Sequence, residues 1–163
     1  MVEKYLQYTC YLIRHKWFVF LECCKIGMIW RGLVHDLSKF RLSEFIPYAK
    51  FFYEIKELKD KSGYYYKPTD MGNEAFNYAW FLHQKRNKHH WQWWTLPGDE
   101  GGLKILEMPE KYINEMVCDW IGARRAQRNS TTCLEWYDKN KNRIKLHPKT
   151  RELLEHKLKQ RFR

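Results

Sequence analysis

Apolar side chains recur every three or four residues along most of the chain, and this spacing predicts helices. The first stretch, residues 2–29, contains no proline, and its single glycine is Gly27, near the end. Its apolar stripe is formed by Tyr5, Tyr8, Leu12, Val19, Cys23 and Ile26. His15 falls on the same stripe, so we expect one long helix whose histidine points into the protein.

A break is predicted between this helix and the next elements. Gly27 and Gly32 bracket the break, and residues 31–37 fit a short second helix. A third helical pattern covers residues 44–61, with Ser43 placed as its N-cap. We therefore expect His35 and Asp36 to lie at the end of the short helix.

The second half of the chain alternates between loops and helices. Residues 61–76 contain glycine and proline and are expected to form a loop. Helices are predicted over residues 73–88, 108–127 and 147–160, and residues 95–102 are expected to form an exposed turn. Hydrophobic positions nowhere alternate with a period of two, so no strand is predicted. The pattern favours an all-α fold of five to seven helices in a single compact domain spanning residues 1–163.

The chain carries an excess of positive charge. Its formal net charge is +11, from 30 Lys and Arg against 19 Asp and Glu. This favours an anionic partner such as a nucleotide, another small phosphorylated ligand or nucleic acid. Residues 139–163 are very basic, so a C-terminal segment that is packed on the domain or partly mobile accounts for the charge equally well. Hydrophobic residues make up 44% of the chain, which excludes an intrinsically disordered protein.

The cysteines indicate a reducing compartment. There are five, an odd number, and they include no C-x-x-C pair, so neither a disulfide framework nor a zinc ribbon is expected. Cys10 and Cys118 lie within apolar patterns and are predicted to be core residues. No apolar stretch approaches the ~20 residues of a membrane span, and the short apolar run at residues 17–21 does not predict a secretory signal. We expect a cytoplasmic protein with no membrane partner.

Histidines and aspartates form the candidate chemical site. A single histidine on an apolar face is more often a core residue than a ligand. Asp119, however, lies among apolar residues in the middle of a predicted helix, where an unpaired carboxylate is costly. A divalent cation held by Asp119 and Asp36 with nearby histidines would remove that cost. Imidazole and carboxylate ligands suit Fe, Mn, Zn, Ni or Co.

The order of these residues resembles the metal-dependent His-Asp (HD) phosphohydrolase superfamily. The stretch "HDLSK", from His35 to Lys39, is similar to the His-Asp-x-x-Lys segment of that superfamily, and "NKHHWQWW" is similar to the paired-histidine segment of its longer, multi-metal members. A closer likeness is to small bacterial and phage proteins with "HDLSKF", "N-x-HH" and "EM-x-x-DW" segments. The likeness runs from His15 to about Arg125.

The resemblance implies a ligand set. Its core metal ligands would be His15, His35, Asp36 and Asp119. A second metal position would be completed by His83 with one or both of His89 and His90. On a continuous helix His83 and His90 share a face and His89 does not, a preference that disappears if the helix breaks between them. The interval from His83 to the histidine pair is shorter than in many multi-metal members, so one or two ions are expected.

The activity that the resemblance implies is hydrolysis of a phosphomonoester or phosphodiester by a metal-activated water. Asp36 would bridge two ions or orient the water, and Lys39 would hold a phosphate oxygen. Further substrate contacts are predicted for Asn87, Arg124 and Arg125, although each also fits an ordinary helix end. Two acids are left open: Glu115 as a support for a ligand or an intrahelical partner, and Glu44 as a simple first-turn acid.

Two other functions fit the same residues. A histidine-rich ligand set also serves di-iron oxygenases in some branches of the superfamily. Alternatively, the chain is a non-enzymatic basic module in which "WQWW" and the C-terminal basic segment bind a nucleotide or nucleic acid. Oligomeric state and substrate are not specified by the sequence.

Overall fold

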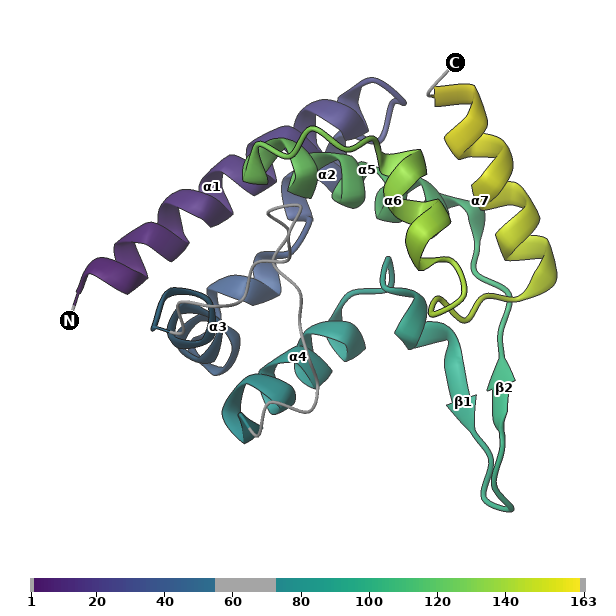
Figure 1. Ribbon diagram of the computed structural model, residues 1–163, viewed down its shortest axis with the longest axis horizontal. Helices are drawn as coiled ribbons and strands as arrows, with labels where there is room; N and C mark the ends of the chain where they lie inside the picture. Colours follow the sequence, from purple (N-terminus) through teal and green to yellow (C-terminus); the bar gives the residue numbers. More distant parts are fainter. Residues whose placement is uncertain (1, 55–72, 162–163) are drawn as a thin grey trace.

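Helices make up most of the computed structural model, which describes residues 2–54 and 73–161 (Figure 1). The seven α-helices of these residues are α1 (Glu3–Cys24), α2 (Ile29–Val34), α3 (Leu42–Glu54), α4 (Glu74–Arg86), α5 (Glu110–Gln127), α6 (Cys133–Asn140) and α7 (Pro148–Arg161). Two short 3₁₀ helices, η1 (Leu37–Phe40) and η2 (Trp91–Trp94), lie between them. The predicted all-α class is confirmed.

The long helices α1 and α5 pack directly against each other. The predicted stripe on α1 is buried, and it includes His15 together with Leu12 and Val19. Gly122 of α5 allows the close approach, because a Cβ at this position would lie 2.4 Å from Cγ2 of Val19 and 2.8 Å from its backbone nitrogen. The two helices that carry His15 and Asp119 are therefore held side by side.

Two apolar clusters flank this helix pair. One joins α1, α3 and α4 and has Tyr8, Phe51 and Phe76 at its centre. The other joins α5, α6 and α7, and it buries Leu154 and Leu158 of the basic C-terminal segment. Residues 148–161 are thus packed on the rest of the protein.

The structure corrects several predicted boundaries. The first helix ends at Cys24 and not near residue 29, because the chain turns through Gly27 with φ of +73°. The third helix already begins at Leu42, where Arg41 accepts the first backbone hydrogen bonds, so Ser43 is not the N-cap. Cys10 is exposed and not a core residue. The predicted helix end at residues 55–61 and most of the loop at 61–76 lie outside the described residues.

A β-hairpin replaces the predicted exposed turn. Strand β1 (Thr95–Pro97) pairs antiparallel with β2 (Leu103–Ile105), and Thr95 lies opposite Ile105. Each strand has only three residues, too few for an alternating pattern to be recognised. Across the described residues, no helix is both long enough and apolar enough to span a membrane.

Candidate metal centre

Asp36 occupies a sharp turn between α2 and η1. Its backbone has φ of 53° and ψ of 25°, the left-handed conformation that aspartate adopts more readily than most residues. His35, the residue that ends α2, is extended, so the two side chains enter the protein from a turn and not from a helix. Both are only 1% exposed. The turn thus places both Asp36 carboxylate oxygens inside the protein.

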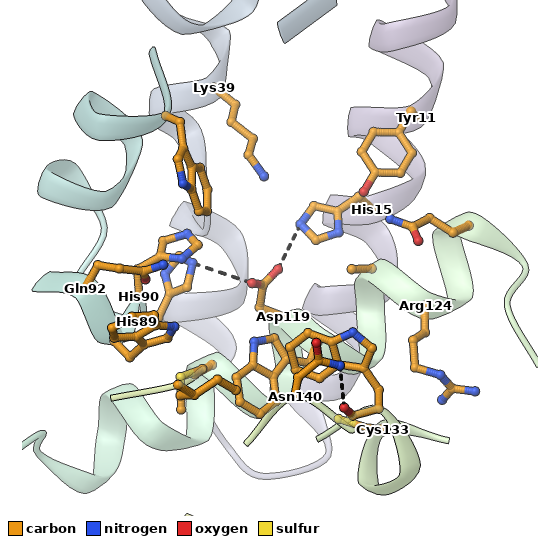
Figure 2. A pocket seen from close by; sticks show the side chains of 18 of the residues that line it. Tyr11, His15, Lys39, His89, His90, Gln92, Asp119, Arg124, Cys133 and Asn140 are labelled. Carbon is orange, nitrogen blue, oxygen red and sulfur yellow. Dashed lines mark hydrogen bonds and ion pairs between the residues drawn. The ribbon is translucent and has the colours of Figure 1, made fainter. Parts of the chain in front are cut away.

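One carboxylate oxygen of Asp36 faces a first group of donors. Its Oδ2 lies 3.6 Å from Nε2 of His15 and 3.5 Å from Nε2 of His35. Oδ1 of Asp119, from α5, lies 3.2 Å and 3.4 Å from the same two nitrogens. Figure 2 shows His15 pointing at Asp119. The four donor atoms come from α1, the turn after α2 and α5, and all lie within 4.8 Å of one another.

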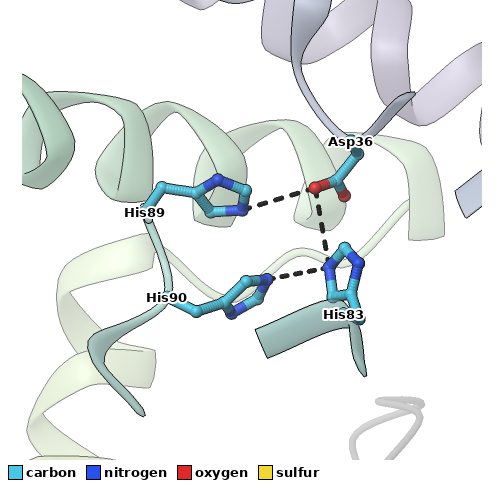
Figure 3. Close-up of side chains that lie close together, drawn as sticks. All are labelled: Asp36, His83, His89 and His90. Carbon is cyan, nitrogen blue, oxygen red and sulfur yellow. Dashed lines mark hydrogen bonds and ion pairs between the residues drawn. The ribbon is translucent and has the colours of Figure 1, made fainter. Parts of the chain in front are cut away.

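The other oxygen of Asp36 faces a second group. Its Oδ1 lies 3.5 Å from Nε2 of His83 and 3.4 Å from Nε2 of His89. Nε2 of His90 lies 2.8 Å from Nε2 of His83 (Figure 3). Helix α4 ends at Arg86, and a turn closed by the 3.1 Å hydrogen bond from His90 N to the Asn87 carbonyl oxygen brings both His89 and His90 back toward His83. The interruption of the helix thus allows both histidines to take part.

These donor groups have the chemistry and spacing of metal sites. Within the part of the chain that the structure describes, Nε2 of His15, His35 and His89 is buried and forms no hydrogen bond, and neither does Oδ1 of Asp36. Buried polar atoms left in this state are costly. Donors about 2.1 Å from a shared ion would be separated by roughly 3.0–3.4 Å, close to the contacts seen here. The buried groups can therefore hold a metal ion, and Asp36 belongs to both of them.

Glu115 connects one histidine of each group. Its Oε1 lies 3.2 Å from Nδ1 of His35 and 3.4 Å from Nδ1 of His89. Its Oε2 accepts a 2.7 Å hydrogen bond from Arg31. A carboxylate on Nδ1 fixes the tautomer that leaves Nε2 available as a ligand. Glu115 thus orients two histidines at once, and it is not an intrahelical partner.

Glu44 orients the imidazole of His83 in the same way. Its Oε2 lies 2.9 Å from Nδ1 of His83, and its Oε1 accepts a 2.6 Å hydrogen bond from Arg86. Ser38 donates to Oε2 over 2.9 Å. Glu44 is fully buried, so it is more than a simple first-turn acid.

Comparison with known protein families identifies a match over nearly the whole chain. The sequence profile described as "Family of unknown function (DUF5662)" covers residues 4–160. The chain belongs to the DUF5662 family. Among curated proteins and among solved structures, no significant match was found.

The buried charges of this DUF5662 protein stabilise one another. Burial opposes ionisation of Asp36 and Asp119, but the surrounding histidines hold the pKa of both carboxyls well below its usual range. Burial alone would lower the pKa of His35, yet the carboxylates around it raise that pKa to about 10. The carboxylates of Asp36 and Asp119, which stabilise positive charge beside them this strongly, are suited to binding a divalent cation.

A cavity of about 800 Å³ opens onto the centre. Lys39 and Arg124 line it, and Figure 2 shows Lys39 pointing toward the Asp119 carboxylate. Nζ of Lys39 lies 2.6 Å from Oδ2 of Asp36. Although burial opposes its charge, the Asp36 carboxylate raises the pKa of Lys39, so the lysine stays protonated. The rest of the wall is rich in aromatic rings, among them those of Tyr8, Tyr11, Trp80, Trp91, Trp120 and Trp136.

Two of the predicted substrate contacts lie elsewhere among the described residues. Asn87 caps α4 and donates hydrogen bonds to the His83 carbonyl oxygen over 2.8 Å and to Oγ of Ser38 over 2.9 Å. Arg125 pairs with Glu22 over 2.8 Å and stacks on the ring of Phe18. Neither lines the cavity.

The sequence analysis missed the two arginines that hold the supporting glutamates, Arg31 and Arg86. Glu115 itself was considered as a support, because it precedes Asp119 by one helical turn and so shares its face. No comparable signal marks Arg31, because its partner lies 84 residues away in the chain.

Proposed function

We propose that this DUF5662 protein is a metal-dependent phosphohydrolase of the HD type. The observation that carries the proposal is the position of Asp36 between two donor groups, with one carboxylate oxygen facing each. Lys39 lies three residues further on and lines the adjoining cavity. Two cation positions next to a lysine at a cavity wall are suited to a phosphate ester.

The ligands divide into two sets under this proposal. One ion would be held by His15, His35, Asp36 and Asp119, and the other by Asp36 with His83, His89 and His90. The nitrogen-rich donors favour Fe, Mn, Zn, Ni or Co over Mg or Ca. When bound, such ions lower the pKa of water and neutralise charge on phosphate oxygens.

The protein's own groups would bind and orient the substrate. Lys39 is held charged beside Asp36, where it would donate to a phosphate oxygen as a point charge. Arg124 lines the same cavity and would contact a more distant anionic group. The tryptophan and tyrosine rings would cover an apolar or heterocyclic part of the substrate and exclude water from the phosphate. A small nucleotide has this combination of features.

Elemental analysis and a substrate panel test the proposal. Purified full-length protein should contain transition metal and should release product from phosphomonoesters or phosphodiesters. Asp36→Asn should lose metal and at least about a hundredfold in activity, because it removes a ligand of both ions. Asp138→Asn, at a surface aspartate of α6 that pairs with Lys141, is the matched control.

The outcomes separate the rival functions. Protein without metal, or an Asp36→Asn variant with full activity, would refute the phosphohydrolase. Oxygen uptake after anaerobic iron loading, coupled to substrate loss, would instead identify a di-iron oxygenase. Nucleic-acid binding that survives metal removal and falls steeply with salt would identify a binding module.

A further inference from the structure

The outer surface of α1 and α2 is apolar. On α1, Leu6, Ile13 and Trp17 are all more than half exposed. At 100° per residue they fall within about 40° of one another, opposite the buried stripe that contains His15. Such a run of large exposed side chains is unusual on a soluble helix and marks a contact surface.

Helix α2 extends this surface. Gly32 faces α1, since a Cβ there would lie 3.0 Å from Cα of Phe20. Trp30, about 160° from Gly32 around the helix, faces away from α1 and is 73% exposed, and Leu33 lies about 60° from Trp30 and is 50% exposed. Lys16 of α1 donates a hydrogen bond to the Leu33 carbonyl oxygen, which places α2 directly beside the exposed stripe of α1. We call Leu6, Ile13, Trp17, Trp30 and Leu33 together the N-terminal apolar face.

The chain around this face is predominantly basic. Residues 3–43 have seven Lys and Arg against three acids, Glu3, Glu22 and Asp36. Glu22 and Asp36 are buried and paired with cationic side chains, so Glu3, at the start of α1, is the exposed acid of this segment. Arg14 and Arg41 are exposed in the same segment. The face therefore combines large apolar side chains with a predominantly basic margin.

We infer that the N-terminal apolar face binds the surface of an anionic lipid bilayer. Tryptophan and leucine partition into the interface between headgroups and acyl chains, while lysine and arginine bind anionic headgroups. A second copy of the chain is a poorer occupant, because the margins of two such faces both carry an excess of positive charge and would repel each other. Binding of this kind needs no membrane-spanning helix. The inference therefore revises the expectation of no membrane partner, which was based on the lack of a spanning segment.

Co-sedimentation with vesicles tests this inference on the full-length protein. The protein should pellet with vesicles of equal parts phosphatidylcholine and phosphatidylglycerol, and it should stay in solution with vesicles of phosphatidylcholine alone. Leu6→Ser with Leu33→Ser should weaken binding at least about tenfold, since two apolar side chains no longer enter the bilayer. Leu96→Ser with Leu103→Ser is the matched control, because these hairpin leucines are 51% and 52% exposed on another element.

A charge-reversal variant keeps the test decisive if the leucine variant misfolds. Arg14→Glu with Arg41→Glu should also lose at least about tenfold in binding to the anionic vesicles. Failure of the unmodified protein to pellet with anionic vesicles would overturn the inference, and so would equal binding to both lipids. A dimer in sedimentation velocity that Leu6→Ser with Leu33→Ser dissociates, without vesicle binding, would assign the face to a second copy.

Discussion

Oε1 of Glu115 lies 3.2 Å from Nδ1 of His35, although the two residues are 80 positions apart in the chain. Glu115→Gln keeps the size of the side chain but removes the charge that orients the imidazole. Metal affinity should fall about 10–100-fold, as is typical when the partner of a ligating histidine is lost. Titration of metal-free protein with Zn²⁺ or Mn²⁺ would measure the change.

Glu110→Gln is the control for this experiment. Glu110 lies on the same helix and pairs with Lys157, but it is exposed and remote from the centre. Unchanged affinity in Glu115→Gln would show that the contact does not support a ligand.

Metal stoichiometry should depend on which ligand is removed. His15→Ala and His83→Ala each disrupt one donor group, so each should leave about one ion per chain if two are bound. Asp36→Asn should remove both, because its two oxygens face different groups. Elemental analysis after gel filtration gives the counts. Equal losses in all three variants would mean that the donors form one site and not two.

Stability should respond to pH in opposite ways with and without metal. In metal-free protein the pKa of His35 is raised from 6.5 to about 10, so its charge stabilises the fold below pH 6.5. That stabilisation should be lost as the pH rises through about 10. Metal ions compete with protons for the imidazoles, so stabilisation by added metal should grow over the same pH interval.

Denaturant unfolding at several pH values checks this, with and without a chelator. His35→Gln should flatten the metal-free profile, whereas His156→Gln, an exposed histidine of α7, should not. A metal-free protein whose stability rises with pH from 6.5 to 10 would contradict the assignment of charge to His35.

The helices with a strong apolar period were predictable from sequence, and so was the set of histidines and aspartates that the structure brings together. The stripe on α1 fixed the inward direction of His15, and the apolar surroundings of Asp119 marked it as a costly carboxylate. The hairpin was missed because three-residue strands carry too little pattern. Glu44 was left as a first-turn acid because the helix dipole already explains an acid at that position. The contact between Glu44 and His83 depends on how α3 and α4 pack, and this packing cannot be predicted from a local sequence pattern.

Gly122→Ala should weaken metal binding although Gly122 is not itself one of the proposed ligands. The added Cβ would lie 2.4 Å from Cγ2 of Val19 and 2.8 Å from its backbone nitrogen, and α1 and α5 must move apart to relieve the contact with the backbone. We expect about 1–3 kcal/mol of destabilisation and weaker metal binding, because His15 and Asp119 sit on the separated helices. Thermal unfolding and metal titration measure both effects.

Val19→Ala offers a rescue test of the same contact. Combined with Gly122→Ala it should recover part of the loss, since the nearest clashing atom is removed, and the double-mutant cycle should show coupling. Strict additivity of the two variants would mean that the helices do not meet as described.

The proposed ligands of the centre come from segments scattered between His15 and Asp119, and this has a consequence during synthesis. The chain leaves the ribosome from its N-terminus, so five histidines and Asp36 emerge before α5 can close over them. Under the proposed function, these donors would form an incomplete and accessible cation site until Glu115 and Asp119 emerge. Metal selection in the cell would then be decided partly by which ion meets the nascent chain first, and retention by the closure of α5 against α1.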